Sequence, residues 1–127
     1  MRHTFWLIVI AAAAFSCSGP AKFGDIDLER WRNDRGACQD FRKEEIPDIG
    51  KVKPELLGKN SNEIGKMFGA PDIQQLGTRN QKIYIYFVES GPQCQDKNRS
   101  AEANKLIFRF NAVSLLTEIN FQREMPE

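Results

Sequence analysis

The sequence is almost without histidine. Its one histidine, His3, lies beside an apolar N-terminal stretch, and residues 4–127 contain none. Histidine is the commonest general base and a frequent zinc ligand, so its absence argues against Ser–His–Asp sets, Cys–His pairs and H-E-x-x-H zinc sites. The remaining carboxylates and lysines form no recognisable catalytic spacing. We therefore predict no catalytic residue, no metal site and no cofactor, and a protein that is not an enzyme.

An excess of charge is also absent. The chain has 18 Lys and Arg against 17 Asp and Glu, a formal net charge of +1. Binding of nucleic acid requires a basic surface that displaces counterions, and electrostatic binding to anionic lipid requires a polybasic segment. We therefore expect no nucleic-acid partner, and any attachment to a membrane must be covalent.

The sequence has one apolar run of note, from Thr4 to Ala14, between Met1-Arg2-His3 and Phe15-Ser16-Cys17. At about a dozen residues, it is shorter than the roughly 20 that a helix needs to span a bilayer. A basic start, an apolar middle and a small residue before a cysteine are typical of a bacterial lipoprotein signal peptide, which predicts removal of residues 1–16. A plain secretory signal ending at Ser16 and an uncleaved anchor are the alternatives.

Cys17 is then the lipidation site. Two or three acyl chains, such as palmitate, would attach the protein to the membrane stably, whereas one chain attaches only reversibly. Residues 17–24 are predicted to be a lipidated tether in which Ser18-Gly19-Pro20-Ala21 is flexible. Ser18 occupies the position at which an aspartate would retain a lipoprotein in the inner membrane. We therefore expect the protein to lie in the cell envelope, anchored to the outer membrane and facing the periplasm.

Two cysteines remain, Cys38 and Cys94. Outside the cytoplasm such a pair is more often a disulfide than a metal site or a catalytic thiol, although two unpaired buried thiols are the alternative. A bond between them would stabilise the fold by about 4 kcal/mol in the chain-entropy model.

The first part of the predicted mature chain has helical patterns. Residues 22–45 are predicted to form a first helical segment, capped by Asp25 or Asp27, with Trp31 in the core and a weak point at Gly36 where the helix can split. The alternating charges along it are interpreted as a solvated face: Arg30, Arg32, Asp34, Arg35, Asp40, Arg42, Lys43 and Glu44.

A short second helix is predicted further along. Residues 46–54 are interpreted as a connector, because Pro47 and Pro54 disfavour helix at the preceding residues. Asn60 is a good N-cap with Glu63 placed to complete a capping box, and Gly69 ends the helix. The apolar face consists of Ile64, Met67 and Phe68.

After Pro71 the period changes from helical to alternating. Strands are predicted at 73–76, 82–88 and 105–110, and alternation continues through Leu115, Thr117, Ile119 and Phe121 before a polar tail at 123–127. Both faces of the 82–88 strand are apolar, which predicts a central strand. The sequence thus predicts one α+β domain at 25–122, with two N-terminal helical segments packed on an antiparallel sheet of three to four strands.

The order of two helical segments followed by antiparallel strands, after a lipidated cysteine, resembles that of the small outer-membrane lipoproteins of the SmpA/OmlA (BamE-like) family. The resemblance covers Leu56 to Phe121 and is carried by Leu57-Gly58-Lys59, Glu63-Ile64, Phe68-Gly69-x-Pro71-Asp72, Ile83-Tyr84-x-Tyr86 and Leu106-x-Phe108-x-Phe110. It implies a non-catalytic partner of the machinery that inserts barrel proteins into the outer membrane. The Cys38/Cys94 pair and the 89–103 loop depart from that pattern.

Three functions follow as hypotheses. The first is an envelope lipoprotein that acts through contacts with another envelope protein, with Tyr84 and Tyr86 as a possible partner surface because tyrosine is enriched at interfaces. The second is a periplasmic ligand-binding or inhibitor module. The third is a hydrolase using acidic residues such as Glu63, Asp72 or Glu118, which for glycosides requires two carboxyls about 5 to 9 Å apart.

Overall fold

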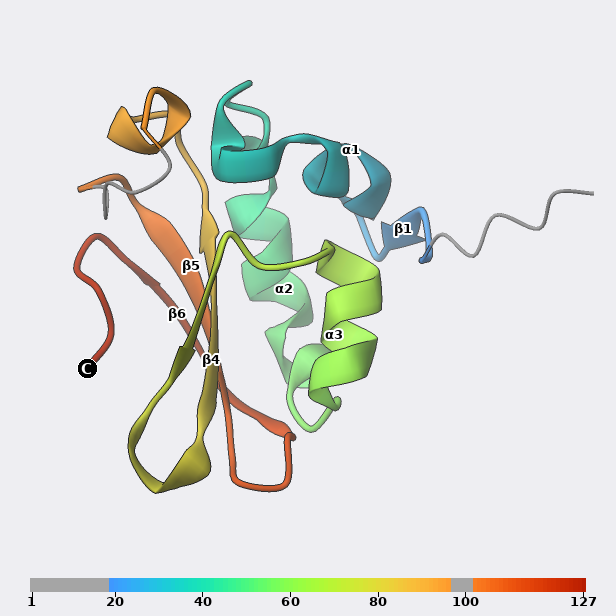
Figure 1. Ribbon diagram of the computed structural model, residues 1–127. Coiled ribbons are helices and arrows are strands. Elements are labelled where there is room, and N and C mark those ends of the chain that lie inside the picture. Colours follow the sequence, from blue (N-terminus) through green and yellow to red (C-terminus); the bar gives the residue numbers. More distant parts are fainter. Residues whose placement is uncertain (1–18, 97–101) are drawn as a thin grey trace, which may run out of the picture.

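The computed structural model describes residues 19–96 and 102–127, so Cys17 and the predicted signal peptide lie outside the described residues. It has an α+β fold in which helices cover one face of a four-stranded antiparallel sheet (Figure 1). The predicted fold class is therefore confirmed. In the described part of the chain, no helix combines the length and the apolar character that crossing a membrane requires.

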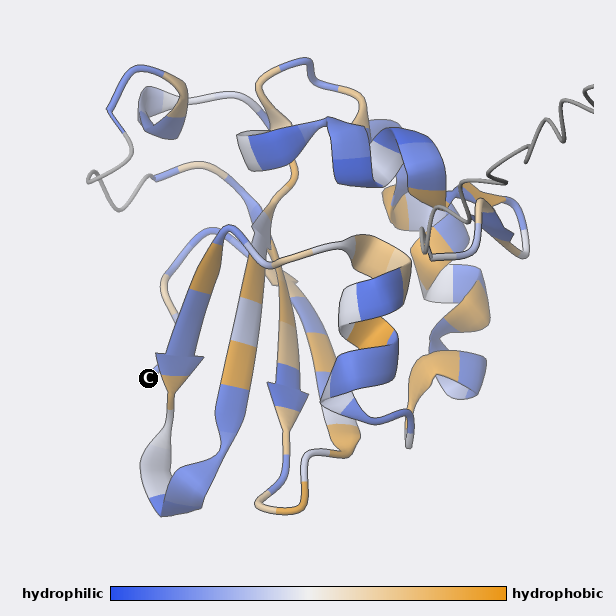
Figure 2. Cartoon of the chain, turned by 45° about the vertical axis from the view of Figure 1, so that its right-hand side comes forward, coloured by the Kyte–Doolittle hydropathy of each residue, from blue (hydrophilic) through white to orange (hydrophobic). Residues whose placement is uncertain are grey.

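The sheet follows the chain order. It consists of β3 (Ile73–Leu76), β4 (Lys82–Phe87), β5 (Lys105–Phe110) and β6 (Leu116–Gln122), each antiparallel to the next. β4 is an inner strand buried on both faces, as its unbroken apolar run predicts. In Figure 2 the tip between β3 and β4 is hydrophilic, which is typical of a solvent-exposed turn.

The main core lies between this sheet and the helices. The rings of Tyr86 and Phe108 on the sheet pack against Phe68 on the helical layer, and Tyr86 also packs against Trp31. Neighbouring rings lie 5.0 to 6.1 Å apart, at the separations that aromatic pairs favour. Trp31 is fully buried, which confirms its prediction as a core residue.

The predicted partner surface of Tyr84 and Tyr86 is therefore wrong. Tyr84 is 9% exposed and Tyr86 is 0% exposed, because the helices cover their face of the sheet. The Tyr86 hydroxyl donates a hydrogen bond to the Gly69 carbonyl at 2.7 Å, and burial raises the pKa of Tyr86 above its ordinary value. Both tyrosines stabilise the core.

The outer face of the sheet is covered by the C-terminal residues. Ile83, Ile85 and Ile107 form a second apolar cluster there, against which Met125 packs. The Lys105 ammonium donates to the carbonyl of Arg123 at 2.6 Å, and burial lowers the pKa of Lys105. The predicted domain ends at residue 122, and contacts with the sheet continue beyond it through Met125 and the carbonyl of Arg123.

The last strand has an irregularity that alternation alone did not predict. The register between β5 and β6 shifts at Arg109 and Phe110, so Leu116 is opposite Phe110 while Ile119 is opposite Phe108. The bulge leaves Leu115 outside the strand and places Leu116 in the core.

The predicted first helix over 22–45 is wrong in its extent. Its place is taken by several short elements: β1 (Lys22–Phe23), β2 (Ile26–Asp27), α1 (Leu28–Asn33) and the 3-10 helices η1 (Arg35–Ala37) and η2 (Arg42–Glu45). Asp27 caps α1 as predicted, and its carboxylate accepts the N–H of Arg30 at 3.1 Å. Gly36 has a φ of 68° and ends helical geometry there, as expected of this weak point.

Asp34 explains why the helix does not continue. Its side chain is buried and accepts hydrogen bonds from the backbone N–H groups of Gln39, Phe41 and Arg42 at 2.8 to 3.2 Å. A carboxylate that satisfies three backbone donors favours a turn over a helix. The side chain of Arg42 therefore enters the core instead of lying on a solvated face.

The predicted connector at 46–54 is also wrong, because these residues belong to α2 (Ile46–Leu56), which continues directly from η2. Pro47 lies in the first turn, where its missing N–H would have had no helical partner. Pro54 lies near the end of the helix. Burial of Ile49 and Leu56, seven residues apart, holds this helix against the core.

The short helix α3 (Ser61–Phe68) forms as predicted. The side-chain oxygen Oδ1 of Asn60 accepts the N–H of Glu63 at 2.8 Å, and Gly69 ends the helix with a φ of 81°. The Glu63 carboxylate accepts a hydrogen bond from Lys59 at 3.3 Å. The predicted apolar face of Ile64, Met67 and Phe68 is buried in the core.

The predicted tether boundary at residue 24 is wrong. Arg32 donates hydrogen bonds to the carbonyls of Gly19 and Pro20, and the Ala21 carbonyl accepts the N–H groups of Leu28 and Glu29. β1 then pairs with β2. Residues 19–24 thus belong to the folded domain.

Glu45 provides a test of these helix contacts through pH. Its side chain is buried and accepts the N–H of Asp27 at 3.3 Å, yet burial raises the pKa of Glu45 above its ordinary value. The ordinary pKa applies to Glu45 in the unfolded chain and the raised pKa to Glu45 in the folded protein. Between these two values, the unfolded chain has already lost the carboxyl proton while the folded protein still holds it. The wild-type free energy of unfolding therefore falls across that window.

We expect Glu45→Gln to remove this loss. The free energy of unfolding of the variant minus that of wild type should be larger at pH 7 than at pH 4. Urea unfolding of both proteins at both pH values measures this difference. Glu44→Gln, at an exposed neighbouring position, controls for the removal of one negative charge. An equal pH dependence in the two variants would contradict the assignment.

Candidate binding cleft at the disulfide

A disulfide joins Cys38 to Cys94, as predicted. Cys38 follows η1, and Cys94 lies in η4 (Pro92–Cys94), within the connection between β4 and β5. The two Cα atoms are 5.7 Å apart and are separated by 56 positions in sequence. The bond thus holds the β4–β5 connection against the end of the first helical region.

Side chains also hold this connection in place. The Gln93 amide donates to the carbonyls of Gly36 at 2.9 Å and Glu89 at 2.8 Å. The Asp40 carboxylate accepts hydrogen bonds from the N–H and hydroxyl of Ser90, each at 2.9 Å. These bonds, the backbone one above all, lower the pKa of Asp40. The connection is therefore fixed at several points.

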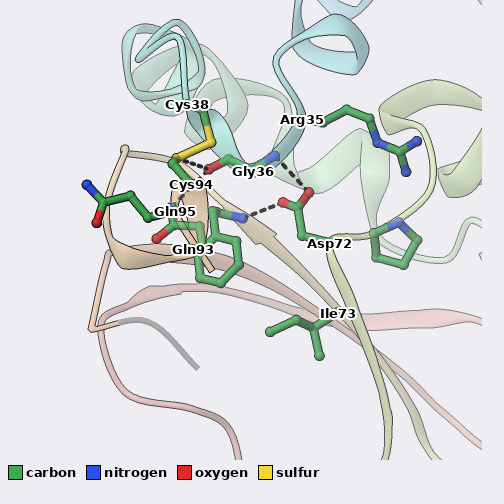
Figure 3. Close-up of a pocket in the computed structure, with 10 residues that line it drawn as sticks. Arg35, Gly36, Cys38, Asp72, Ile73, Gln93, Cys94 and Gln95 are labelled. Carbon is green, nitrogen blue, oxygen red and sulfur yellow. Dashed lines mark hydrogen bonds between the residues drawn. A yellow bond between two sulfur atoms is a disulfide. The ribbon is translucent and has the colours of Figure 1, made fainter. Parts of the chain in front are cut away.

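A cleft of about 500 Å³ opens beside the disulfide (Figure 3). It lies where η1, the start of β3, the end of β4 and η4 meet. Its lining residues are Arg35, Gly36, Cys38, Pro71, Asp72, Ile73, Phe87, Gln93, Cys94 and Gln95. Apolar side chains therefore form part of the wall, together with a few polar groups.

Asp72 joins the two layers at the cleft. Its Oδ1 accepts the N–H of Gly36 at 2.9 Å, and its Oδ2 accepts the N–H of Phe87 and Nη1 of Arg42, both at 2.8 Å. Arg42 is 1% exposed and also donates to the carbonyls of Trp31 and Phe87. Because its carboxylate is occupied by three donors, Asp72 is suited to a structural role.

Arg35 is the cleft's available cation. Its side chain is exposed, and its guanidinium makes no hydrogen bond or ion pair with any residue of the described segments. In the view of Figure 3, Arg35 and the disulfide lie on opposite sides of Asp72. An unpaired guanidinium presents several donors in a planar arrangement that suits a carboxylate or phosphate.

The three carboxylates considered for a hydrolase do not share a site. Glu63, on α3, pairs with Lys59, which precedes that helix. Asp72 pairs with Arg42, and Glu118 pairs with Arg109 on the outer face of the sheet. Among the described residues, no group of three or more Cys, His, Asp or Glu is placed to hold a metal ion.

The disulfide could be predicted from the sequence, but the cleft beside it could not. Arg35 is predicted on a solvated face, and Asp72 is considered only in the motif that carries the family resemblance and as a hydrolase carboxylate. Pattern analysis had no signal for Arg35, since exposed arginines are common in such segments.

No protein-family model, curated protein or solved structure matched the chain in the three comparisons made.

Proposed function

We propose that this chain is an envelope lipoprotein, anchored through Cys17, that acts without catalysis by binding another envelope protein in the disulfide cleft. The observation that carries the proposal is Arg35, whose guanidinium has no partner among the described residues and which lines the cleft together with the apolar residues Pro71, Ile73 and Phe87. A partner segment with a carboxylate next to an apolar side chain would fit both features.

The surroundings of the cleft support this proposal. A binding site is more effective when its walls are already in place, because less conformational freedom is lost on binding. Here the disulfide, Gln93 and Asp72 fix the walls before any partner arrives. A disulfide also favours a compartment outside the cytoplasm. A role as an accessory subunit in outer-membrane assembly rests on the family resemblance and remains a prediction.

A ligand-binding module is the second candidate. A volume of about 500 Å³ is within the range of small-molecule sites, roughly 300 to 1,000 Å³. The same Arg35 would then bind a small anion with an apolar portion. Recovery of the lipidated protein without any protein partner, together with such an anion, would favour this function.

We expect Arg35→Glu to reduce partner recovery about tenfold, which corresponds to about 1.4 kcal/mol. The substitution would place a negative charge against the partner's carboxylate. Recovery is measured by mild crosslinking in the native envelope, purification of the full-length protein and mass spectrometry. Cys17→Ala tests the need for the anchor.

Arg79→Glu is the matched control. Arg79 is exposed at the turn between β3 and β4 and undergoes the same change of charge. It should leave partner recovery unchanged. Equal losses in the two arginine variants, with unchanged stability, would contradict a specific role for the cleft.

A further inference from the structure

The first described residues are seated tightly on the helical layer. Gly19 lies against the end of α3, where a Cβ would overlap the backbone carbonyl of Lys66. Only glycine fits this position without a shift of the backbone. The path of the chain as it enters the domain is therefore fixed by close contact.

Arg32 holds this segment to the helix. Its Nη1 donates to the carbonyls of Pro20 at 2.7 Å and Met67 at 2.9 Å, and its Nη2 donates to that of Gly19 at 3.3 Å. One guanidinium thus binds both the incoming chain and the last turn of α3. A single charged group shared in this way places Gly19 relative to the whole domain.

The reach of the anchor follows from this position. Only Ser18 separates Cys17 from Gly19. Two residues of fully extended chain span at most about 7 Å. If Cys17 carries lipid in the bilayer, the membrane surface must therefore lie close to Gly19.

Gly19 lies on the helical side of the molecule. β1, which follows it, lies beside α1 and α3, whereas the sheet and the C-terminal end lie on the other side (Figures 1 and 2). We propose that the helical side faces the lipid headgroups of the anchoring membrane, an inference that rests on the proposed anchor at Cys17. The outer face of the sheet, with its C-terminal cover, then points away from that membrane.

Charge plays a minor part in this orientation. The exposed charged residues near the entry point are of both signs, with Lys22 and Lys66 against Asp25 and Glu29. Arg32 and the close contact of Gly19 with α3 fix the point where the chain enters the domain. Because the anchor is only two residues from that point, its short reach determines which side faces the bilayer. The occupant of this surface is thus the headgroup layer itself.

The orientation can be measured in lipid vesicles. The full lipidated protein, with its disulfide intact, receives a fluorophore through either Lys66→Cys on the helical side or Glu118→Cys on the outer face of β6. The vesicles contain lipid with a quencher on the headgroup. We expect quenching several-fold stronger at position 66 than at position 118.

A lengthened tether is the control. A Gly/Ser insertion of about 20 residues between Ser18 and Gly19 extends the average reach to about 25 Å, and it should bring the two positions close to equal quenching. Equal quenching without the insertion, or stronger quenching at position 118, would overturn the orientation. Absence of lipid on Cys17 by mass spectrometry would instead refute the anchor itself.

Discussion

Asp72→Ala is expected to lower the free energy of unfolding by about 3 to 5 kcal/mol, the usual cost of removing one partner of a buried ion pair. The substitution leaves the guanidinium of Arg42, which is 1% exposed, without its counter-charge. It also leaves the N–H groups of Gly36 and Phe87 without their acceptor. Urea unfolding of the purified domain measures the change.

Two further variants separate the causes of this loss. Glu118→Ala removes a half-exposed partner of Arg109 and should cost less than about 1 kcal/mol. A double variant, Arg42→Leu with Asp72→Leu, removes both charges. It still leaves the N–H groups of Gly36 and Phe87 without an acceptor. It should therefore recover part of the loss and retain about 1 to 3 kcal/mol. A loss below 1 kcal/mol for Asp72→Ala would refute the joining role of Asp72.

The second large effect concerns the disulfide. Replacement of Cys38 and Cys94 together by serine should lower the free energy of unfolding by about 4 kcal/mol, because the unfolded chain regains the freedom of a long loop. Gln93 and Asp40 still hold the β4–β5 connection, so we expect the fold to persist. Urea unfolding of the double variant gives the change.

Reduced wild-type protein is the control for the serine side chains and should match the double variant. Circular dichroism in the absence of urea shows whether the sheet is retained. An unchanged unfolding midpoint would mean that the bond does not restrict the unfolded chain.

The sheet and the second predicted helix could be derived from the sequence because their signals are local. Alternation over 82–88 and 105–110 predicts strands since successive side chains point to opposite faces. Asn60 and Gly69 mark the ends of α3 by satisfying or ending its backbone bonds. These features depend on residues a few positions apart, which the sequence shows directly.

The helical region before them could not be derived in the same way. Whether 46–56 is helix depended on burial of Ile49 and Leu56 in a core made largely by the sheet. The inward course of Arg42 depended on Asp72, which lies 30 positions away. Local propensity has no access to such partners, and it favoured a solvated face and a connector instead.

The sequence by itself thus determined the α+β class, an antiparallel sheet of three to four strands, α3 and the cysteine pair, because each rests on periodicity, capping or composition. Only the tertiary structure decided the burial of Tyr84 and Tyr86, the contact of Gly19 with α3, and the cleft that Arg35 lines. The physical reason is that burial and pairing depend on the groups that the fold brings together from distant positions, and a binding site is made of such groups.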